Sequence, residues 1–342
     1  MIRYRSDLID LQKSNLNYAL KKHADIDLSL VTSPYVWNID IESVINAKKP
    51  EVLGKYGKPF GNSEFIERLS DHEGLPPGWI MIVPGADFAI EVICKQFLGD
   101  KSEACIIIPT FPRFEIVISA MENVDITYAV DIQSIDKNYN LVLLCSPNNP
   151  TTNQIDVASL KTALAKCKNT LFCVDAVLGV YGDVDFTSIA MEYDNLVVIK
   201  SFSKLGLAGL RLGYIIGNPD IIKYMQTALS PFAVPDLMQL IGLSILNDYE
   251  RVELIHTQLD ASWKQIEREW RGRLIRNSRV PFYLLQINGE ANDAANKLYE
   301  KRISVVSGQF FRGLGSKYLR IALGTKQENE RLVQAVNECR LI

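Results

Sequence analysis

The feature that most constrains the fold of this chain is an alternation that runs from residue 80 to residue 230. Short apolar runs are followed, again and again, by longer amphipathic stretches. Apolar strands that alternate with helices predict an α/β domain whose mostly parallel sheet is covered by helices. The expected strands are 80–83, 104–108, 125–129, 141–145, 171–174 and 196–199, and the expected helices are 86–97, 114–120, 157–166 and 220–229.

The pattern changes after Pro235. Apolar residues recur every three or four positions from Val252 to Trp270, which predicts one long amphipathic helix that ends near Gly272. Further strands are expected at 282–287, 303–306 and 318–323, and further helices at 291–301 and from Gln327. We therefore expect an N-terminal segment (1–45) packed on a small α+β C-terminal domain (236–342), with the long helix joining that domain to the large one (46–235).

Composition narrows the class of protein. The chain has 342 residues and a net charge of −3, which suits a two-domain enzyme and gives no electrostatic reason to expect a nucleic-acid or membrane partner. No apolar run approaches the ~20 residues of a membrane span, and the charged first ten residues do not resemble a signal peptide. Six cysteines without a CxxC pair indicate reduced thiols and a cytoplasmic location. Three scattered histidines argue against a metal site or a Ser/His/Asp hydrolase.

Polar residues follow several of the expected strands, and ligands of open α/β sheets bind at the carboxyl ends of strands. Gly85, Ala86 and Asp87 open a helix, where backbone N–H groups can bind a phosphate, although a plain turn capped by Asp87 explains them too. Phe111 lies between two prolines and is either a platform for a flat ring or a core residue. Asn149 lies in the rigid string SPNNPT and is either a fixed amide or a turn residue.

Three charged residues occupy apolar surroundings. Asp175 ends the strand at 171–174 and is either a carboxylate that needs a partner or a turn residue. Lys204 lies beside the strand at 196–199 and is either a solvated flank residue or a partly desolvated amine that can attack an aldehyde. Arg320 lies inside an apolar strand and calls for an anion, either a structural carboxylate or a substrate carboxylate. The phosphate donors expected around Lys204 are Ser201, Ser203 and Arg211.

Together these residues describe one ligand, a planar aromatic aldehyde that carries a phosphate, a ring nitrogen and a phenolic oxygen. The strings NNPT, SFSK and GLRLGY, with the aspartate after an apolar strand, resemble the fold-type I pyridoxal-phosphate enzymes in this order. The resemblance is to the class I/II aminotransferases, with histidinol-phosphate aminotransferase as a near relative. It runs from about Tyr56 to Gly324.

The resemblance implies a role for each matching residue. Lys204 forms a Schiff base with pyridoxal 5'-phosphate and later moves a proton between the substrate Cα and the cofactor. Asp175 pairs with the ring nitrogen, Asn149 bonds the phenolic oxygen, and Phe111 stacks on the ring. Arg320 binds the substrate carboxylate. The residues implied for binding the cofactor phosphate are Gly85, Ala86, Asp87, Ser201, Ser203 and Arg211. The resemblance also implies a homodimer with shared active sites, in which Tyr56 reaches the phosphate of the neighbouring subunit.

The sequence also departs from the family pattern. Leu178 stands where the family commonly has a tyrosine that donates to the phenolic oxygen. Loss of this donor should raise the pKa of the Schiff base, unless Tyr181 or another hydroxyl compensates. The asparagine string reads NPTT where glycine commonly follows NPT, and the spacing from Lys204 to Arg211 is one residue shorter than in close histidinol-phosphate relatives. The segment 30–37 matches the usual substrate loop only loosely.

We therefore expect an aminotransferase that acts on an amino acid and a 2-oxo acid. The alternative keeps the site and changes the reaction, to a lyase, decarboxylase or cyclase similar to threonine-phosphate decarboxylase or capreomycidine synthase. A third reading, a regulator that uses the fold as a sensor, is disfavoured because the chain has no room for an added DNA-binding domain and no basic segment. The side chain of the substrate is not indicated by these motifs.

Overall fold

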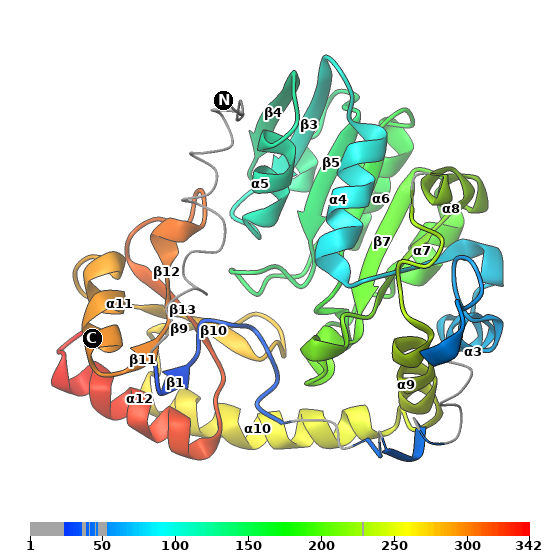
Figure 1. The fold of residues 1–342 in the computed structure, drawn as a ribbon. Coiled ribbons are helices and arrows are strands. Elements are labelled where there is room, and N and C mark those ends of the chain that lie inside the picture. Colours follow the sequence, from blue (N-terminus) through cyan, green and yellow to red (C-terminus); the bar gives the residue numbers. More distant parts are fainter. Residues whose placement is uncertain (1–23, 36–38, 41, 45, 47–52, 228) are drawn as a thin grey trace, which may run out of the picture.

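The computed structural model describes residues 24–35, 39–40, 42–44, 46, 53–227 and 229–342. These residues form sheets of seven, four and two strands. A long helix runs beneath the two larger sheets (Figure 1). Residues 1–23, and with them much of the N-terminal segment expected to pack on the small domain, lie outside the described residues. The site described below lies on the larger sheet, at the edge that faces the smaller one.

The larger sheet has seven strands, and six of them run in the same direction. Only β8 is antiparallel, to β7 on one side and to β2 on the other. Mostly parallel sheets of this kind need helices on both faces, because neither face can be left in water. The strand order is β2 (Ile80–Val83), β8 (Gly213–Gly217), β7 (Leu196–Ser201), β6 (Leu171–Asp175), β5 (Leu141–Cys145), β3 (Ser102–Ile107) and β4 (Val124–Ala129).

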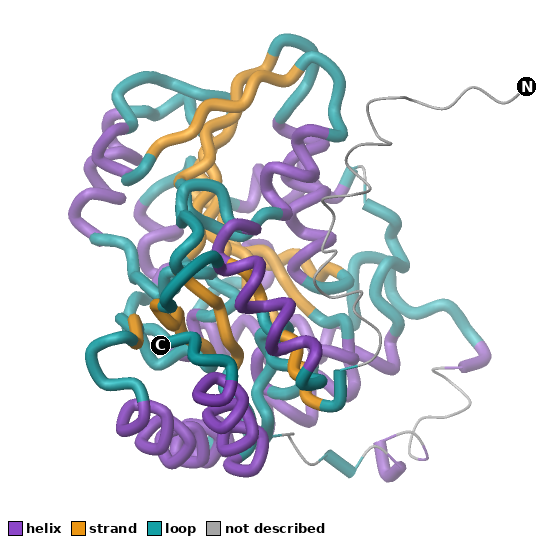
Figure 2. Tube along the Cα trace, turned by 90° about the vertical axis from the view of Figure 1, so that its left-hand side faces the viewer, coloured by secondary structure: helices purple, strands orange, loops and turns teal. Residues whose placement is uncertain are grey.

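Helices cover the two faces of this sheet, as the turned view in Figure 2 shows. In β6, Leu171 and Cys173 belong to one buried cluster, and Phe172 and Val174 belong to the other, because successive strand residues point to opposite faces. The first cluster includes residues of α4 (Ala86–Phe97), α5 (Arg113–Ser119) and α8 (Pro219–Gln226). The second includes residues of α3 (Ser63–Glu73), α6 (Val157–Lys166), α7 (Phe186–Glu192) and α9 (Asp236–Asn247).

The smaller sheet is antiparallel and lies at the C-terminal end of the chain. Its strand order is β12 (Val306–Ser307), β13 (Tyr318–Ala322), β10 (Phe282–Gln286) and β9 (Leu274–Ile275). The helices of this part are α10 (Arg251–Glu269), α11 (Ala291–Glu300) and α12 (Lys326–Glu338). Trp263 of α10 packs edge-on against Tyr283 of β10, with ring centroids 5.6 Å apart. The long helix is thereby fixed to the smaller sheet.

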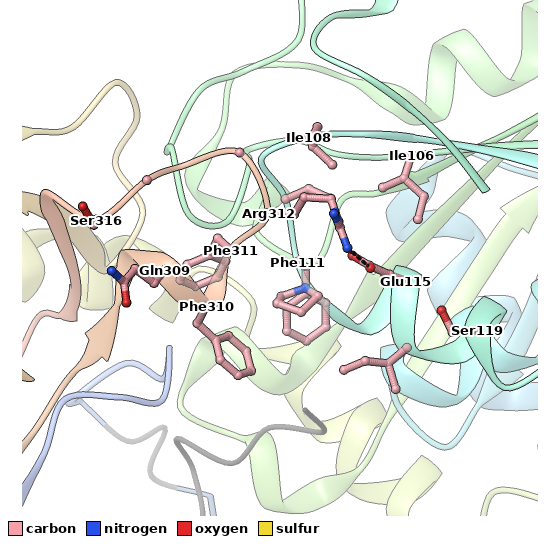
Figure 3. A pocket seen from close by; sticks show the side chains of 15 residues that line it. Ile106, Ile108, Phe111, Glu115, Ser119, Gln309, Phe310, Phe311, Arg312 and Ser316 are labelled. Carbon is pink, nitrogen blue, oxygen red and sulfur yellow. Dashed lines mark hydrogen bonds and ion pairs between the residues drawn. The ribbon is translucent and has the colours of Figure 1, made fainter. Parts of the chain in front are cut away.

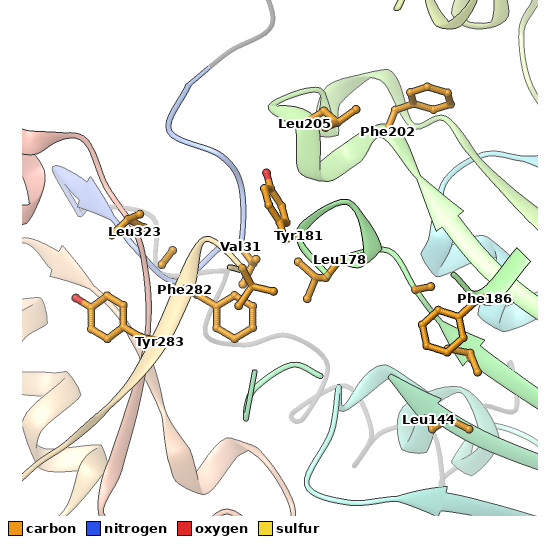
Figure 4. Close-up of a cluster of buried hydrophobic side chains, with 14 of the residues drawn as sticks. Val31, Leu144, Leu178, Tyr181, Phe186, Phe202, Leu205, Phe282, Tyr283 and Leu323 are labelled. Atoms are coloured by element: carbon orange, nitrogen blue, oxygen red, sulfur yellow. The ribbon is translucent and has the colours of Figure 1, made fainter. Parts of the chain in front are cut away.

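An N-terminal strap, which we define as residues 26–33, joins the two parts. Its β1 (Ile26–Asp27) pairs in parallel with β11 (Ile303–Ser304), and the carbonyl of Leu28 accepts a hydrogen bond from Ala322 N. Val31 is buried within an apolar cluster that also contains Leu178 and Phe282 (Figure 4). The strap therefore crosses from the smaller sheet to the carboxyl edge of the larger one.

The expected α/β class with a mostly parallel sheet is confirmed. β2, β5, α4 and α6 have the predicted bounds. The sequence analysis did not identify α3, α7, α9 or β8. Glycines at both ends of β8 weaken its strand pattern, and α7 has only seven residues, whose start is fixed by the side chain of Asp185. Within the described ranges, no helix is long and apolar enough to cross a membrane.

Candidate active site

A cavity of about 330 Å³ lies at the carboxyl ends of β5, β6 and β7. This is the edge of a parallel sheet at which ligands are expected. Most of the predicted site residues line the cavity together, although they come from segments spread over more than two hundred residues. The predicted residues in its wall are Ala86, Asp87, Phe111, Asn149, Asp175, Ser203, Lys204, Arg211 and Arg320.

Lys204 lies in a short 3₁₀ turn, Phe202–Leu205, that directly follows β7. The Ser201 side chain caps this turn by accepting a hydrogen bond from Ser203 N at 3.1 Å. The Lys204 amine donates to the carbonyl of Val31 at 2.6 Å. Burial, together with the nearby Arg320 cation, lowers the pKa of Lys204 to about 8, although Asp175 opposes this shift. The amine is therefore far more available as a nucleophile near neutral pH than a lysine in water.

Asp175 ends β6 next to Cys145, its partner in the register of β5. Its Oδ1 accepts a hydrogen bond from Val177 N at 3.0 Å, and the side chain is buried. Burial raises the pKa of Asp175 to about 6, although the hydrogen bond and Lys204 act against the shift. A carboxylate in this position can stabilise a protonated ring nitrogen, because opposite charges attract more strongly in a buried site than in water.

The two neighbouring asparagines in the string SPNNPT have different roles. Asn148 fixes the loop, since its amide donates to Pro109 O at 2.8 Å and to Thr151 Oγ1 at 2.7 Å. Asn149 instead lines the cavity, and its Oδ1 accepts a hydrogen bond from Arg320 Nη1 at 3.2 Å. Its amide nitrogen can then donate to a ligand oxygen in the cavity.

Arg320 is buried in β13 and reaches the cavity from the smaller sheet. Besides the bond to Asn149, its Nη2 donates to the carbonyl of Ser29 in the N-terminal strap. A guanidinium in this position can bind a carboxylate with two parallel hydrogen bonds once the Ser29 carbonyl moves aside.

The part of the cavity suited to the cofactor phosphate forms where the backbone at Gly85 lies close to the Arg211 side chain. Gly85 has φ +86°, and a Cβ there would lie 2.6 Å from Arg211 Nη2, so this position requires glycine. Arg211 itself has φ 49°, a left-handed conformation that is rare for a residue with a side chain. The N-terminus of α4, the Ser203 hydroxyl and this guanidinium form a donor set suited to a phosphate dianion. The residues present therefore fit pyridoxal phosphate.

The remaining predicted residues differ in how close they lie to the cavity. Gly85 and Ser201 lie just behind its wall, against Arg211 and Ser203. Asp87 does not cap α4 but accepts a hydrogen bond from Arg113 Nε at 2.6 Å. Tyr56 lies on the surface, with 85% of its area exposed.

The sequence profile described as "Aminotransferase class I and II" matches residues 27–336 of the chain. The chain belongs to this family. Fold-type I architecture, an α/β sheet with a smaller second part, agrees with the arrangement in Figure 1.

Individual relatives agree with the family assignment. The chain is 27% identical over 301 residues to a histidinol-phosphate aminotransferase of Methanothermobacter thermautotrophicus. The aligned region covers 81% of this chain and 79% of the relative. Its fold is similar to that of the histidinol-phosphate aminotransferase from Sinorhizobium meliloti in complex with pyridoxal-5'-phosphate (TM-score 0.82, 17% identity, 99% and 97% of the two chains). It is also similar to L-threonine-O-3-phosphate decarboxylase from Porphyromonas gingivalis (TM-score 0.73, 22% identity, 92% and 99%).

Family membership and the histidinol-phosphate aminotransferase relative make the protein a pyridoxal-phosphate-dependent aminotransferase. The family match confirms the cofactor expected from the sequence, pyridoxal 5'-phosphate, and the resemblance on which that expectation rested. Both structural neighbours are less than 25% identical to this chain, so they show the shared fold and no more.

Sequence reasoning missed the strap of this aminotransferase. Leu30, Val31 and Thr32 line the cavity, and carbonyls of the strap accept hydrogen bonds from the two cations Lys204 and Arg320. Backbone carbonyls carry no residue-type pattern, so the only indication in the sequence was the loose likeness of 30–37 to a substrate loop, and residues 36–37 of that loop lie outside the described residues.

The structure shows the surroundings of Leu178 and Tyr181, the two residues that concern the missing tyrosine donor to the phenolic oxygen. Leu178 lines the cavity at the position where a tyrosine is common. The Tyr181 hydroxyl donates to the backbone carbonyl of Lys204 at 2.5 Å, so it holds the lysine turn instead of supplying a donor to the cavity. A raised pKa of the lysine–cofactor linkage stays a prediction of the sequence.

The lowered pKa of Lys204 predicts how the rate of cofactor capture depends on pH. The neutral amine attacks the aldehyde, so the rate should rise about tenfold per pH unit up to about pH 8 and level off above it. At pH 7 the neutral fraction of the amine should be roughly 200-fold larger than that of an ordinary lysine of pKa ~10.4. Stopped-flow absorbance after mixing cofactor-free protein with pyridoxal phosphate measures this rate. Free butylamine is the control for titration of the cofactor itself, and a rate that still climbs tenfold per unit from pH 8.5 to 10 would contradict the prediction.

Proposed function

We propose that this aminotransferase attaches its cofactor to Lys204 and moves the amino group of an amino acid to a 2-oxo acid. One observation carries the proposal: a desolvated amine, a buried carboxylate and a buried guanidinium share a single cavity. These groups belong to Lys204, Asp175 and Arg320. When bound, pyridoxal phosphate supplies an aldehyde for the substrate amine and a ring that delocalises negative charge developing at the substrate Cα.

The chain's own residues orient the cofactor in this proposal. Asp175 holds the proton on the ring nitrogen, and its burial strengthens that interaction. Asn149 donates its amide N–H to the phenolic oxygen, and Phe111 stacks on the ring. The phosphate is held by the backbone at Gly85, Ala86 and Asp87 and by the side chains of Ser201, Ser203 and Arg211.

The substrate is bound and deprotonated by two further groups. Arg320 exchanges its bond to the Ser29 carbonyl for the substrate carboxylate, which fixes Cα beside Lys204. The Lys204 amine then takes the proton from Cα and returns it to the aldehyde carbon of the cofactor. A pKa near 8 suits this task, because a group that titrates close to neutral pH both accepts and releases a proton readily.

We assign three parts to the chain: an N-terminal segment (1–45) packed with the small domain, a large cofactor-binding domain (46–235) and a small C-terminal domain (236–342). Support comes from the seven-stranded sheet, which falls within the second part, and from the four-stranded sheet, which falls within the third. The first helix of the third part, α9, packs against α3 of the second part. Pairing of β1 with β11 supports the placement of the first. Limited proteolysis should cut first near residue 235, and an early cut inside either sheet would contradict the division.

A homodimer with shared active sites is proposed from an exposed apolar surface. The Tyr56 ring lies 5.0 Å from Phe232, and Leu53 nearby in sequence is 62% exposed. Exposed aromatic residues of this kind are enriched at protein interfaces. Tyr56 then reaches the cofactor phosphate of the neighbouring subunit. Sedimentation velocity should give about twice the chain mass of 38.5 kDa, and a monomer at micromolar concentration would refute the shared site.

A cytoplasmic location is also proposed. All six cysteines are free, and four of them are buried, as is usual for proteins of a reducing compartment. Cell fractionation tests this directly, since recovery in a secreted or envelope fraction contradicts it.

The reaction is tested by mixing cofactor-loaded protein with single amino acids, with and without 2-oxo acids. Transamination predicts conversion of the cofactor from its aldehyde form to its amine form, and the release of a 2-oxo acid seen by mass spectrometry. Added 2-oxo acid should restore the aldehyde form. Release of CO₂ or water with the aldehyde form retained would instead support the decarboxylase, lyase or cyclase alternative.

A further inference from the structure

A second and larger cavity adjoins the cofactor cavity. It measures about 880 Å³ and lies between α5 with the end of β3 on one side and the loop 309–316 on the other (Figure 3). Phe111 lines both cavities. Phe311 also lines the larger one, and its ring centroid lies 5.6 Å from the guanidinium carbon of Arg320. The larger cavity therefore begins next to the expected positions of the cofactor ring and the substrate carboxylate.

Apolar side chains make up much of the wall of this cavity, and its uncharged polar residues are Thr110, Ser119, Gln309 and Ser316. Isoleucines from β3 and α5 face phenylalanines of the opposite loop across it (Figure 3). The apolar side chains in the wall are those of Ile106, Ile108, Phe111, Ile116, Phe310 and Phe311. Water next to such surfaces is readily displaced by an apolar group.

Charge in the cavity is balanced by one ion pair. Of the described residues that line it, only Glu115 and Arg312 are charged. Arg312 binds Glu115 with two hydrogen bonds, Nε to Oε2 at 2.9 Å and Nη2 to Oε1 at 2.5 Å. The guanidinium also lies over the Tyr128 ring, 4.5 Å from its centroid. The carboxylate therefore cancels the charge that would otherwise attract an anion.

We propose that this cavity receives the side chain of the amino-acid substrate, and that this side chain is large, apolar and uncharged. The inference rests on the proposed function, in which Arg320 holds the substrate carboxylate and Lys204 lies beside Cα. A side chain that leaves Cα between Phe111 and Phe311 enters the larger cavity. A phosphate or carboxylate group there would meet apolar side chains and a cation that Glu115 already neutralises.

The first test is the half-reaction of cofactor-loaded protein with single amino donors. Phenylalanine, leucine and methionine should convert the aldehyde form of the cofactor at least about 10-fold more efficiently than alanine, because the cavity binds the added apolar groups. They should exceed phosphoserine by about 100-fold, because its side chain brings a charge into a cavity whose one cation is already paired with Glu115. The measured quantity is the second-order rate constant from the loss of the aldehyde absorbance.

Two variants then test whether the cavity is responsible. Glu115→Gln removes the carboxylate that neutralises Arg312, so the rate for phosphoserine relative to phenylalanine should rise at least about 10-fold. Ile116→Trp fills part of the cavity, so the rate for phenylalanine relative to alanine should fall at least about 10-fold. Glu300→Gln, an exposed exchange of the same kind on α11, is the matched control and should change neither ratio. Thermal unfolding of each variant shows that it is folded.

The outcomes separate this inference from the function on which it rests. If no amino donor converts the cofactor, the proposed function fails, and the inference fails with it. If phosphate-bearing or acidic donors react fastest, and both variants leave the ratios unchanged, the transaminase proposal stands and the apolar substrate class is overturned. A shift of both ratios in the stated directions supports the inference.

Discussion

Replacement of Lys204 by alanine should abolish the absorbance band of the lysine-bound cofactor and lower the rate of transamination by about 10⁴-fold or more. The variant loses the amine that attaches the cofactor, and it loses the group that moves the proton. Its fold should remain, because the change removes a buried amine whose burial disfavours its charge, as the lowered pKa of Lys204 indicates. Absorbance spectra, single-turnover rates and thermal unfolding measure these three quantities.

The controls for this variant separate chemistry from structure. Lys223→Ala, an exposed lysine on α8, should leave the spectrum and the rate unchanged. A small primary amine added to the Lys204→Ala protein should restore part of the proton-transfer rate, which a merely structural lysine would not allow. Persistence of the bound-cofactor band in Lys204→Ala would refute the assignment of the site.

The second large effect is expected for Asp175→Asn. Asparagine has the same shape and keeps an oxygen that can accept the hydrogen bond from Val177 N, so the variant removes mainly the negative charge. Loss of one partner of a buried charge pair costs about 3–5 kcal/mol. A loss of that size in the transition state lowers kcat by roughly 10²- to 5 × 10³-fold. Steady-state kinetics, together with fluorescence titration of cofactor affinity, measures the effect.

A pH profile gives this variant a signature that a structural role would not produce. Burial raises the pKa of Asp175 to about 6, so protonation should weaken cofactor binding by the native chain as the pH falls through that value. Asp175→Asn should lack this acid limb. The matched control is Asp220→Asn on the exposed first turn of α8, which should keep it. An acid limb of the native size in Asp175→Asn would show that another group is responsible.

Much of the large sheet was predictable because its strands and helices show characteristic patterns over short stretches of sequence. Parallel strands buried on both faces read as apolar runs of four to six residues, and the amphipathic helices between them show a period near 3.6. β2, β5, α4 and α6 were predicted with their observed bounds. The elements that were missed are short, glycine-bounded or without a clear period, so tertiary packing rather than local pattern fixes them.

The candidate site was predictable for a different reason. The carboxyl ends of parallel strands meet at one edge, so polar residues directly after β5, β6 and β7 were expected to converge, and they line one cavity. Ser201 and Tyr56 show the limit of this rule. Ser201 ends β7 but bonds to its neighbours behind the cavity wall. The proposed use of Tyr56 depends on a second subunit.

The sequence by itself determined the fold class, the family resemblance and the lysine that should carry the cofactor, because these depend on short motifs and on local periodicity. Only the tertiary structure decided how the two nearby lysines differ. Lys200 pairs with the buried carboxylate of Glu73 at 2.5 Å, whereas the Lys204 amine lies in the cavity beside Asp175 and donates to Val31 O. The hydrogen bond from Lys204 to Val31 O joins residues 173 positions apart and forms because the strap crosses the edge of the sheet. No local sequence pattern encodes a contact of this kind. The same holds for the apolar cavity beside Phe111, whose two walls meet only when the small part packs against the large sheet.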